Sequence, residues 1–217
     1  MNEIRPLSIF EAVAAPQATV SRKDAILAAA TRVFLRLGFE GASMEAIAQE
    51  AAVVRRTLYN QFPEGKEAIF HAVTERVWDS YPIVDIVADG EALADPAIGL
   101  RRIGEAVAEF WAPAMAVSFL RLVIAEGARF PHLTRSFFDV GKTPAMKALT
   151  GYLDELARRG MLTIEDTELA TRQFLGLIDE PLLWVRVVGQ PEEVSLERRR
   201  LVVDQAVAMF LGHYRKA

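Results

Sequence analysis

Residues 43–62, SMEAIAQEAAVVRRTLYNQF, decide how the N-terminal part of this chain folds. Their pattern predicts two short helices, 43–51 and 54–60, joined by a turn of three to four residues. Helices joined so tightly need a small side chain where their backbones approach each other, and Ala48 supplies it. The apolar wedge against the rest of the domain is then formed by Ile47, Ala51, Val53 and Leu58. The stretch therefore has the pattern of a helix-turn-helix unit.

The second of these helices leaves a mainly polar face pointing outward. The residues expected on it are Val54, Arg55, Arg56, Thr57, Tyr59 and Asn60. Guanidinium groups bind guanine edges or phosphates with two hydrogen bonds, so this face is a candidate surface for double-stranded DNA. A solvated helix face is the alternative, because eight Lys and Arg residues between 21 and 80 are balanced by eight Asp and Glu. A DNA-binding domain normally shows a basic stripe, so any positive patch here must be local.

Two longer helical patterns flank this unit. The first has an apolar stripe at helical spacing, formed by Ile26, Ala30, Val33 and Leu37. Ser21 and Asp24 give it a start that is typical of a capping box, and Gly38 is a natural stop. The second pattern predicts a helix over 66–78, which ends before Pro82.

Beyond a connection at 83–94, the helical patterns become longer and no strand pattern occurs. Helices are expected at 95–111, 113–129, 132–159, 166–188 and 192–214. The sequence therefore predicts an all-α fold of about nine helices. We divide it into an N-terminal arm at 1–20, a helix-turn-helix domain at 21–82 and a larger C-terminal helical domain at 83–217. A mobile terminus is the alternative for the arm.

Composition narrows the class of protein. The chain has 217 residues, 52% of them hydrophobic, and a formal net charge of −4, which suits a folded soluble protein. Its apolar runs are well short of the roughly 18 residues of a membrane span, and no basic segment leads an apolar run as in a secretory signal. The absence of cysteine excludes disulfides and thiol chemistry. We expect a cytoplasmic protein with no membrane partner.

The N-terminal part resembles a known family. Residues 22–78 are similar to the DNA-binding domain of TetR family transcriptional regulators, through the run VFLRLGFEGASMEAIAQEAAVVRRTLYNQFPEGKEAIF. The resemblance implies that Ser43 caps the second helix and faces a phosphate, and that Tyr59 and Lys66 contact the DNA backbone. It also implies that the third helix selects the DNA sequence, through Arg55, Arg56, Thr57 and Asn60.

Two positions depart from the family's usual pattern. Ala52 stands in the turn where the family usually has glycine, and it costs about 1 kcal/mol if the backbone keeps a positive φ there. The loop PEGKE at 63–67 is one residue longer than the common form, which affects where Lys66 lies.

The C-terminal part resembles the AefR-like branch of the same family, through RLVIAEGARFPHLTRSFFDVG at 121–141 and RQFLGLI at 172–178. That resemblance implies a small molecule bound between helices and a homodimer formed through the last two helices. The expected effector contacts are Trp111, Met115, Phe119, Phe138, Phe174 and Ile178. The expected dimer contacts are Trp184, Val203, Val207 and Phe210. Core packing is the alternative for each of these side chains, because aromatic residues at helical spacing usually belong to a core.

Four charges inside apolar runs need partners: Arg121, Glu126, Asp179 and Glu180. A partner for each is another side chain, a water molecule or a ligand.

The sequence and the resemblance together predict a homodimeric repressor that a small, mainly apolar effector releases from a palindromic operator. An activator, or a regulator that needs no effector, is the alternative. An enzyme is a remote alternative, because the three histidines are scattered and no catalytic or nucleotide-binding motif occurs. We therefore expect no catalytic residue, no cofactor and no metal site.

Overall fold

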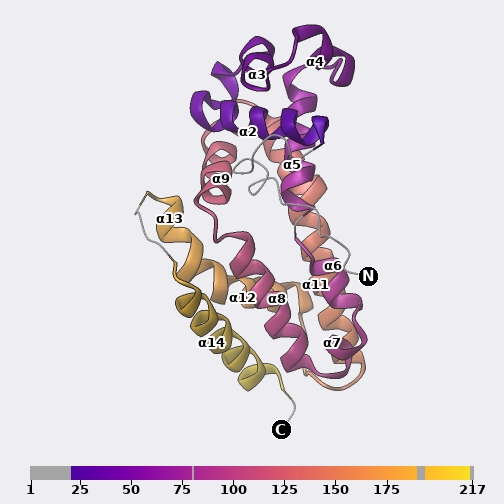
Figure 1. The fold of residues 1–217 in the computed structure, drawn as a ribbon. Coiled ribbons are helices and arrows are strands. Elements are labelled where there is room, and N and C mark those ends of the chain that lie inside the picture. Colours follow the sequence, from indigo (N-terminus) through magenta and orange to yellow (C-terminus); the bar gives the residue numbers. More distant parts are fainter. Residues whose placement is uncertain (1–20, 80, 190–193, 216–217) are drawn as a thin grey trace. The chain divides into compact units, whose positions relative to one another are not determined.

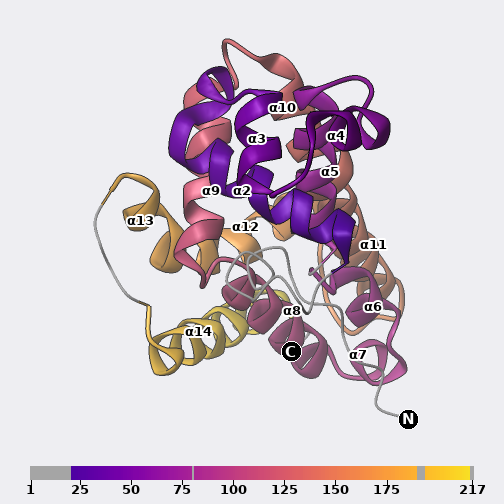
Figure 2. The same cartoon turned by 45° about the horizontal axis from the view of Figure 1, so that its top comes forward.

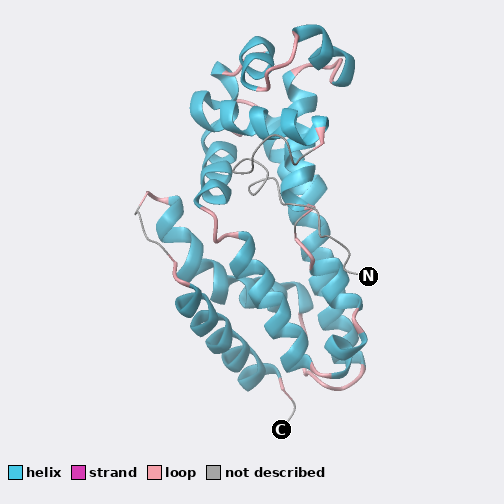
Figure 3. Ribbon diagram, in the orientation of Figure 1, coloured by secondary structure: helices cyan, strands magenta, loops and turns pink. Residues whose placement is uncertain are grey.

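The structure is a computed structural model that describes residues 21–79, 81–189 and 194–215. These residues form helices and no strand, with one isolated bridge between Leu162 and Arg215 (Figure 3). The predicted all-α class is confirmed. The arm predicted at 1–20 lies outside the described residues. No single described helix is long and apolar enough to cross a membrane. One pair of described helices, Pro96–Phe110 and Ala114–Glu126, reaches that length and hydropathy only when the two are taken together, and the pair is bent by 77°.

The described residues form two compact units. The first contains residues 21–79 and 118–141, and the second contains 81–117 and the described part of 142–215. Residues 118–141 thus pack with the N-terminal helices, although they lie within the C-terminal domain predicted at 83–217. Aromatic contacts explain the grouping, since the Phe119 ring stacks on Phe70 at 5.5 Å between ring centroids.

The first unit holds the predicted helix-turn-helix (Figures 1 and 2). Its elements are α2 (Arg22–Gly41), α3 (Met44–Glu50), α4 (Arg55–Gln61), α5 (Lys66–Trp78), the C-terminal part of α9 (Ala114–Glu126), and α10 (Pro131–Phe137). Helix α9 begins in the second unit and ends in the first, so one continuous helix crosses the division.

Helix α2 begins as its sequence predicts. The Ser21 hydroxyl accepts a hydrogen bond from the Asp24 N–H at 3.1 Å, which confirms the cap. Ile26 and Val33 of the predicted stripe are fully buried, whereas Leu37 at its end is 44% exposed. At Gly38 the backbone leaves the helical region with φ of +73°, and the chain turns toward α3.

Helices α3 and α4 pack as a tight pair. Ile47 and Leu58 are fully buried and Ala48 is nearly so, in agreement with the predicted wedge and the small residue at the close approach. Ala52 lies in the turn with φ of +52°, and it is the only residue other than glycine with a positive φ among those that the structure describes. The turn thus keeps the conformation of a glycine turn without the glycine.

In the second unit, α8 packs against four other helices and forms the centre (Figure 1). The elements are α6 (Ile83–Ala88), α7 (Gly90–Ala94), α8 (Pro96–Phe110), α11 (Thr143–Arg158), α12 (Thr167–Asp179), η3 (Glu180–Trp184), α13 (Val185–Val187) and α14 (Leu196–Tyr214). The connection expected at 83–94 contains the short helices α6 and α7. The Asp89 carboxylate starts α7 by accepting hydrogen bonds from two backbone N–H groups, each at 3.1 Å.

Two helices predicted as continuous contain π-helical turns. The pattern at 132–159 is divided into α10, η2 (Phe138–Lys142) and α11, and η3 interrupts the pattern at 166–188. Pro181 accounts for η3, because proline has no N–H to donate and its ring clashes with the carbonyl four residues earlier. The wider π turn removes that clash.

We predict that Ala52→Gly stabilises the protein. Glycine adopts a positive φ without a Cβ clash, which is worth about 0.5–1 kcal/mol after the greater freedom of glycine in the unfolded chain is subtracted. In a protein of this size the melting temperature should rise by about 1–3 °C, measured by circular dichroism. Ala46→Gly inside α3 is the matched control and should lower it. A lower melting temperature for Ala52→Gly would contradict the account of the turn.

Candidate DNA-binding face and effector residues

Helix α4 presents the predicted polar face to solvent. Its first turn follows Val54, which is 70% exposed, and Arg55, Arg56 and Asn60 are exposed as well. Tyr59 is 38% exposed, and Leu58 between these residues is fully buried. The predicted recognition residues, except the half-buried Thr57, therefore lie on the solvent side of a short helix, and the buried Leu58 on its other side fixes that helix to the core.

The guanidinium of Arg55 and the ring of Tyr59 contact each other on this face. The Arg55 guanidinium donates to the Tyr59 hydroxyl at 3.4 Å and lies 5.4 Å from the ring centroid. This hydrogen bond raises the pKa of Arg55, so the guanidinium stays charged. Glu45 of α3 lies 3.8 Å from Arg55 in an exposed ion pair, which contributes little energy in water. The Arg55 side chain is thus preorganised but still available.

Several of the acids that balance the charge of this unit are paired with arginines of other helices. Glu50 accepts hydrogen bonds from Arg32 at 2.7 Å and from Arg36 at 3.0 Å, and the Arg32 bond is the main cause of its lowered pKa. Asp24 accepts from Arg76 at 3.0 Å. The acids Glu50 and Asp24 are thus held by arginines of α2 and α5, away from α4. Helix α4 itself carries Arg55 and Arg56 and no acidic residue, so its charge is positive although the net charge over 21–80 is zero.

Ser43 begins α3. Its hydroxyl accepts a hydrogen bond from the Ala46 N–H at 3.1 Å, so the predicted cap is confirmed. The phosphate contact that the resemblance implies for Ser43 remains a prediction.

Lys66 has a different geometry from the one that a phosphate contact needs. Its ammonium donates to the carbonyls of Phe39, Glu40 and Ala42, at 2.7, 3.2 and 3.0 Å. An ammonium group has three hydrogens, so these bonds use all of its donors inside the protein. In this structure Lys66 holds the segment that leads into α3, and the predicted phosphate contact would require it to release that segment.

The six predicted effector residues are divided between the two units. Trp111, Phe174 and Ile178 are buried in the second unit, where Met115 is partly buried. The other two belong to the first unit, where Phe119 is buried in the aromatic core and Phe138 is 46% exposed. The six side chains thus do not come together within one unit, and their role in effector binding stays a prediction.

Several polar side chains of the second unit lie around the buried carboxylate of Asp179. One carboxylate oxygen, Oδ1, is buried and has no hydrogen-bond partner among the described residues, while the Trp111 side chain donates to the carboxylate. Burial raises the pKa of Asp179, and Lys142 opposes that rise. Burial, together with the nearby charge of Asp179, also raises the pKa of Tyr81. Asp179 stands out in the sequence as a charge in an apolar run, whereas Tyr81 and Lys142, which are distant from it in the chain, carry no such signal.

Trp111 is fixed by a buried arginine. The Arg186 guanidinium, from α13, donates to the carbonyls of Trp111 and Ala112 at 2.6 and 3.0 Å. These carbonyls follow the C-terminal end of α8, where a cation satisfies unpaired acceptors. The described residues hold no group of His, Asp and Glu that could bind a metal ion.

Of the predicted dimer contacts, only Trp184 is exposed, at 49%. Val203, Val207 and Phe210 are buried within the chain itself, where the Phe210 ring packs against Phe174 at 5.2 Å. These three side chains therefore do not lie on the outer face of α14. That face carries other apolar residues, and a groove beside it is lined by Leu177, Pro181, Arg198, Leu201, Val202, Gln205, Ala206 and Met209.

Two family models match this chain. Residues 26–73 match the model described as bacterial regulatory proteins of the tetR family. Residues 98–216, more than half of the chain, match the model described as the C-terminal domain of AefR-like transcriptional repressors. A search of curated proteins gave no match.

Solved structures of regulators are similar to this chain over almost their whole length. A putative TetR family regulator from Mesorhizobium loti is 25% identical with a TM-score of 0.75, and the match covers 90% of this chain and 97% of that one. The flavonoid-responsive regulator FrrA is 28% identical with a TM-score of 0.71, over 89% and 97%. A TetR family regulator from Pseudomonas syringae pv. tomato is 24% identical with a TM-score of 0.73, over 92% and 99%. The exposed face of α4 and these matches lead to one conclusion: the chain belongs to the TetR family of transcriptional regulators, with an AefR-like C-terminal domain.

Proposed function

We propose that this protein is a homodimeric repressor. It binds an approximately palindromic operator through α4, and a small, mainly apolar effector releases it from the DNA. The observation that carries the proposal is the exposed face of α4, where Arg55, Arg56 and Asn60 lie beside Tyr59 on a helix that the buried Leu58 anchors. Guanidinium and amide groups in that arrangement suit base edges in the major groove, and the phenol suits a phosphate.

A two-fold dimer places two copies of α4 on one side of the assembly. Two such helices read half-sites about one helical turn, or about 34–36 Å, apart. The symmetry of the protein then requires an inverted repeat in the DNA.

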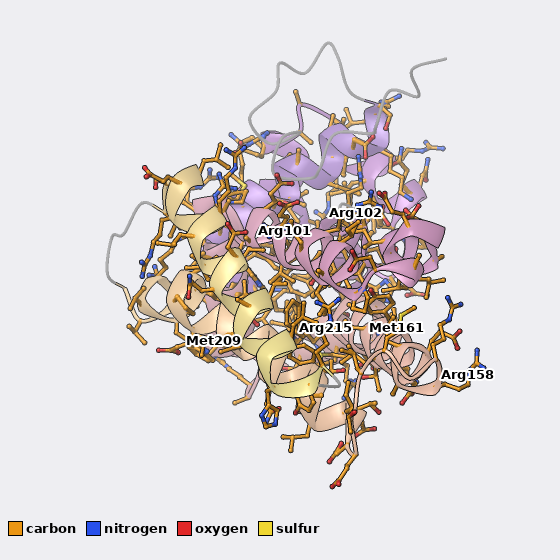
Figure 4. All side chains as sticks on the ribbon, turned by 90° about the horizontal axis from the view of Figure 1, so that it is seen from below. Arg101, Arg102, Arg158, Met161, Met209 and Arg215 are labelled. Atoms are coloured by element: carbon orange, nitrogen blue, oxygen red, sulfur yellow. The ribbon has the colours of Figure 1, made fainter. Side chains whose placement is uncertain are left out.

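The outer face of α12 and α14 is our candidate for the dimer interface. Leu201 and Met209 of α14 are 50% and 58% exposed, and the exposed Trp184 lies in η3, which continues α12 (Figure 4 labels Met209). The adjoining groove is lined mostly by apolar side chains. A second copy of the same face would bury these side chains together, which is the main source of affinity in homodimers.

The effector that we propose has an apolar body and at least one hydrogen-bond donor. Apolar side chains of the second unit, among them Trp111 and Ile178, suit the body, and the unpaired Oδ1 of Asp179 suits the donor. The similar protein FrrA is a flavonoid-responsive regulator, and flavonoids have an apolar body with hydroxyl donors. An effector releases DNA only if it binds the DNA-free conformation more tightly than the DNA-bound one. Helix α5, which leads from Lys66 to the end of the first unit at Trp78, is our candidate for the element that carries the change.

DNA binding is tested by fluorescence anisotropy with labelled DNA from the region upstream of the protein's own gene, in a salt titration with a scrambled competitor. We predict selective binding with a steep negative salt slope. Arg55→Ala and Arg56→Ala should each weaken binding by about 5- to 150-fold, because each removes about 1–3 kcal/mol of phosphate or base contact.

The matched control is Arg158→Ala, which removes an exposed arginine at the end of α11 (Figure 4). It should leave the affinity unchanged. If Arg55→Ala and Arg56→Ala both keep full affinity and selectivity, the assignment of α4 as the recognition helix is wrong.

The dimer interface is tested by Met209→Glu. A buried unpaired carboxylate on each copy should weaken the dimer by about 100-fold, and sedimentation equilibrium at micromolar concentration measures this change. Val84→Glu on α6 is the control, since Val84 is equally exposed, at 60%, outside the proposed interface. A monomeric unaltered protein, or a Met209→Glu variant that stays fully dimeric, would contradict the proposed interface.

The buried carboxylate is tested by the pH dependence of Asp179→Asn. Because burial raises the pKa of Asp179 in the folded state, ionisation opposes folding, and the stability of the unaltered protein falls as the pH rises above the ordinary pKa of 3.8. Asparagine does not titrate, so the variant should melt about 2–4 °C higher at pH 8, a gain of about 1 kcal/mol, and show no such gain at pH 4.

Asp154→Asn on the exposed side of α11 is the matched control, because it makes the same substitution where the side chain is solvated, and it should leave the melting temperature nearly unchanged. If Asp179→Asn is no more stable than the unaltered protein at pH 8, the buried carboxylate of Asp179 does not destabilise the folded protein, and this account is wrong.

A further inference from the structure

Glu126, at the end of α9, finds its partners in the backbone that precedes the helix-turn-helix. Its Oε1 accepts a hydrogen bond from the Phe39 N–H at 2.9 Å, and its Oε2 accepts from the Glu40 N–H at 3.0 Å. Both carboxylate oxygens are therefore used on two successive backbone groups that lie 86 or more residues away in the chain.

These two N–H groups need an outside acceptor because of Gly38. A residue with φ of +73° and ψ of 171° ends the regular helix, so the N–H groups that follow it cannot all reach the carbonyls four residues earlier. Buried or half-buried N–H groups without acceptors are unfavourable, and hydrogen bonds to a carboxylate are stronger than those to a neutral oxygen.

The same segment is held from its carbonyl side by Lys66. We define the junction as residues 38–42, which separate the regular part of α2 from the cap of α3. Lys66 donates to three carbonyls of the junction and lies 4.6 Å from the centroid of the Phe39 ring. A carboxylate on the N–H groups and an ammonium on the carbonyls thus fix the junction in one conformation, directly before Ser43 starts α3.

Packing leaves no spare room at this contact. A Cβ added to Gly38 would lie 2.4 Å from Oε1 of Glu126, so only glycine admits the carboxylate there. The Phe39 ring packs against Phe130 at 5.2 Å, and Arg129 forms an ion pair with Glu40. Glu126 and the two residues Arg129 and Phe130 that follow it therefore contact the junction together.

We propose that Glu126 is a positioning residue for DNA recognition: its carboxylate fixes the junction and hence the start of α3. The effect on DNA affinity rests on the proposed function, whereas the fixing of the junction does not. Loss of the two hydrogen bonds that Glu126 accepts frees the junction and releases the orientation of α3 and α4.

The experiment compares Glu126→Gln with Glu40→Gln. Glutamine at 126 keeps the size of the side chain but turns one acceptor into a donor that faces an N–H group. Glutamine at 40 removes the charge that pairs with Arg129 and leaves the backbone bonds intact. Hydrogen exchange of the Phe39 and Glu40 amides, followed by NMR, measures the junction directly, and circular dichroism checks that each variant is folded.

We expect the two amides to exchange about 10- to 100-fold faster in Glu126→Gln and at the unaltered rate in Glu40→Gln, while amides inside α8 stay protected. The affinity for upstream DNA should fall about tenfold or more in Glu126→Gln only. Unchanged exchange at both amides, or faster exchange with unchanged DNA affinity, would overturn the positioning role. If the unaltered protein binds no DNA selectively, the proposed function fails, whereas the exchange comparison still decides whether Glu126 fixes the junction.

Discussion

The backbone between α2 and α3 has to end one helix and begin another within five residues, and the orientation of the DNA-binding face depends on how its polar groups are satisfied. Gly38 makes the turn possible, and Glu126 and Lys66 supply the acceptors and donors that the local chain lacks. Phe39 anchors the same segment in the aromatic core. Helix α4 makes few contacts of its own, so the precision of its placement comes from this junction and from the tight α3–α4 turn.

Local features of this design could be predicted from the sequence because they depend on neighbouring residues. The cap at Ser21 and the small residue at Ala48 follow from rules that act over a few positions. The exposed face of α4 follows from helical periodicity in the same way. The cap at Ser43 and the special turn at Ala52 were expected from the resemblance to the family.

Contacts over long distances in the chain could not be predicted in this way. Periodicity identifies an apolar stripe on α14 but not which helix covers it, so Val203 and Phe210 were expected in a dimer contact and instead pack inside the chain. A lone Glu126 in an apolar run indicates an unknown partner, and only the fold shows that the partner is backbone. The environment of Asp179 could not be predicted either, because its neighbours Tyr81 and Lys142 are distant in the chain. Asp179 directly precedes the π turn at Pro181. Such features, which lower stability locally, are typical of functional sites.

The central claim is that two copies of α4 read an inverted repeat. Selection of bound duplexes from a random-sequence DNA library by the purified protein, followed by sequencing, tests this claim most directly. The account predicts enrichment of one motif with two inverted half-sites whose centres lie about one helical turn apart. Enrichment of no motif, or of a single half-site without a symmetric partner, would contradict it.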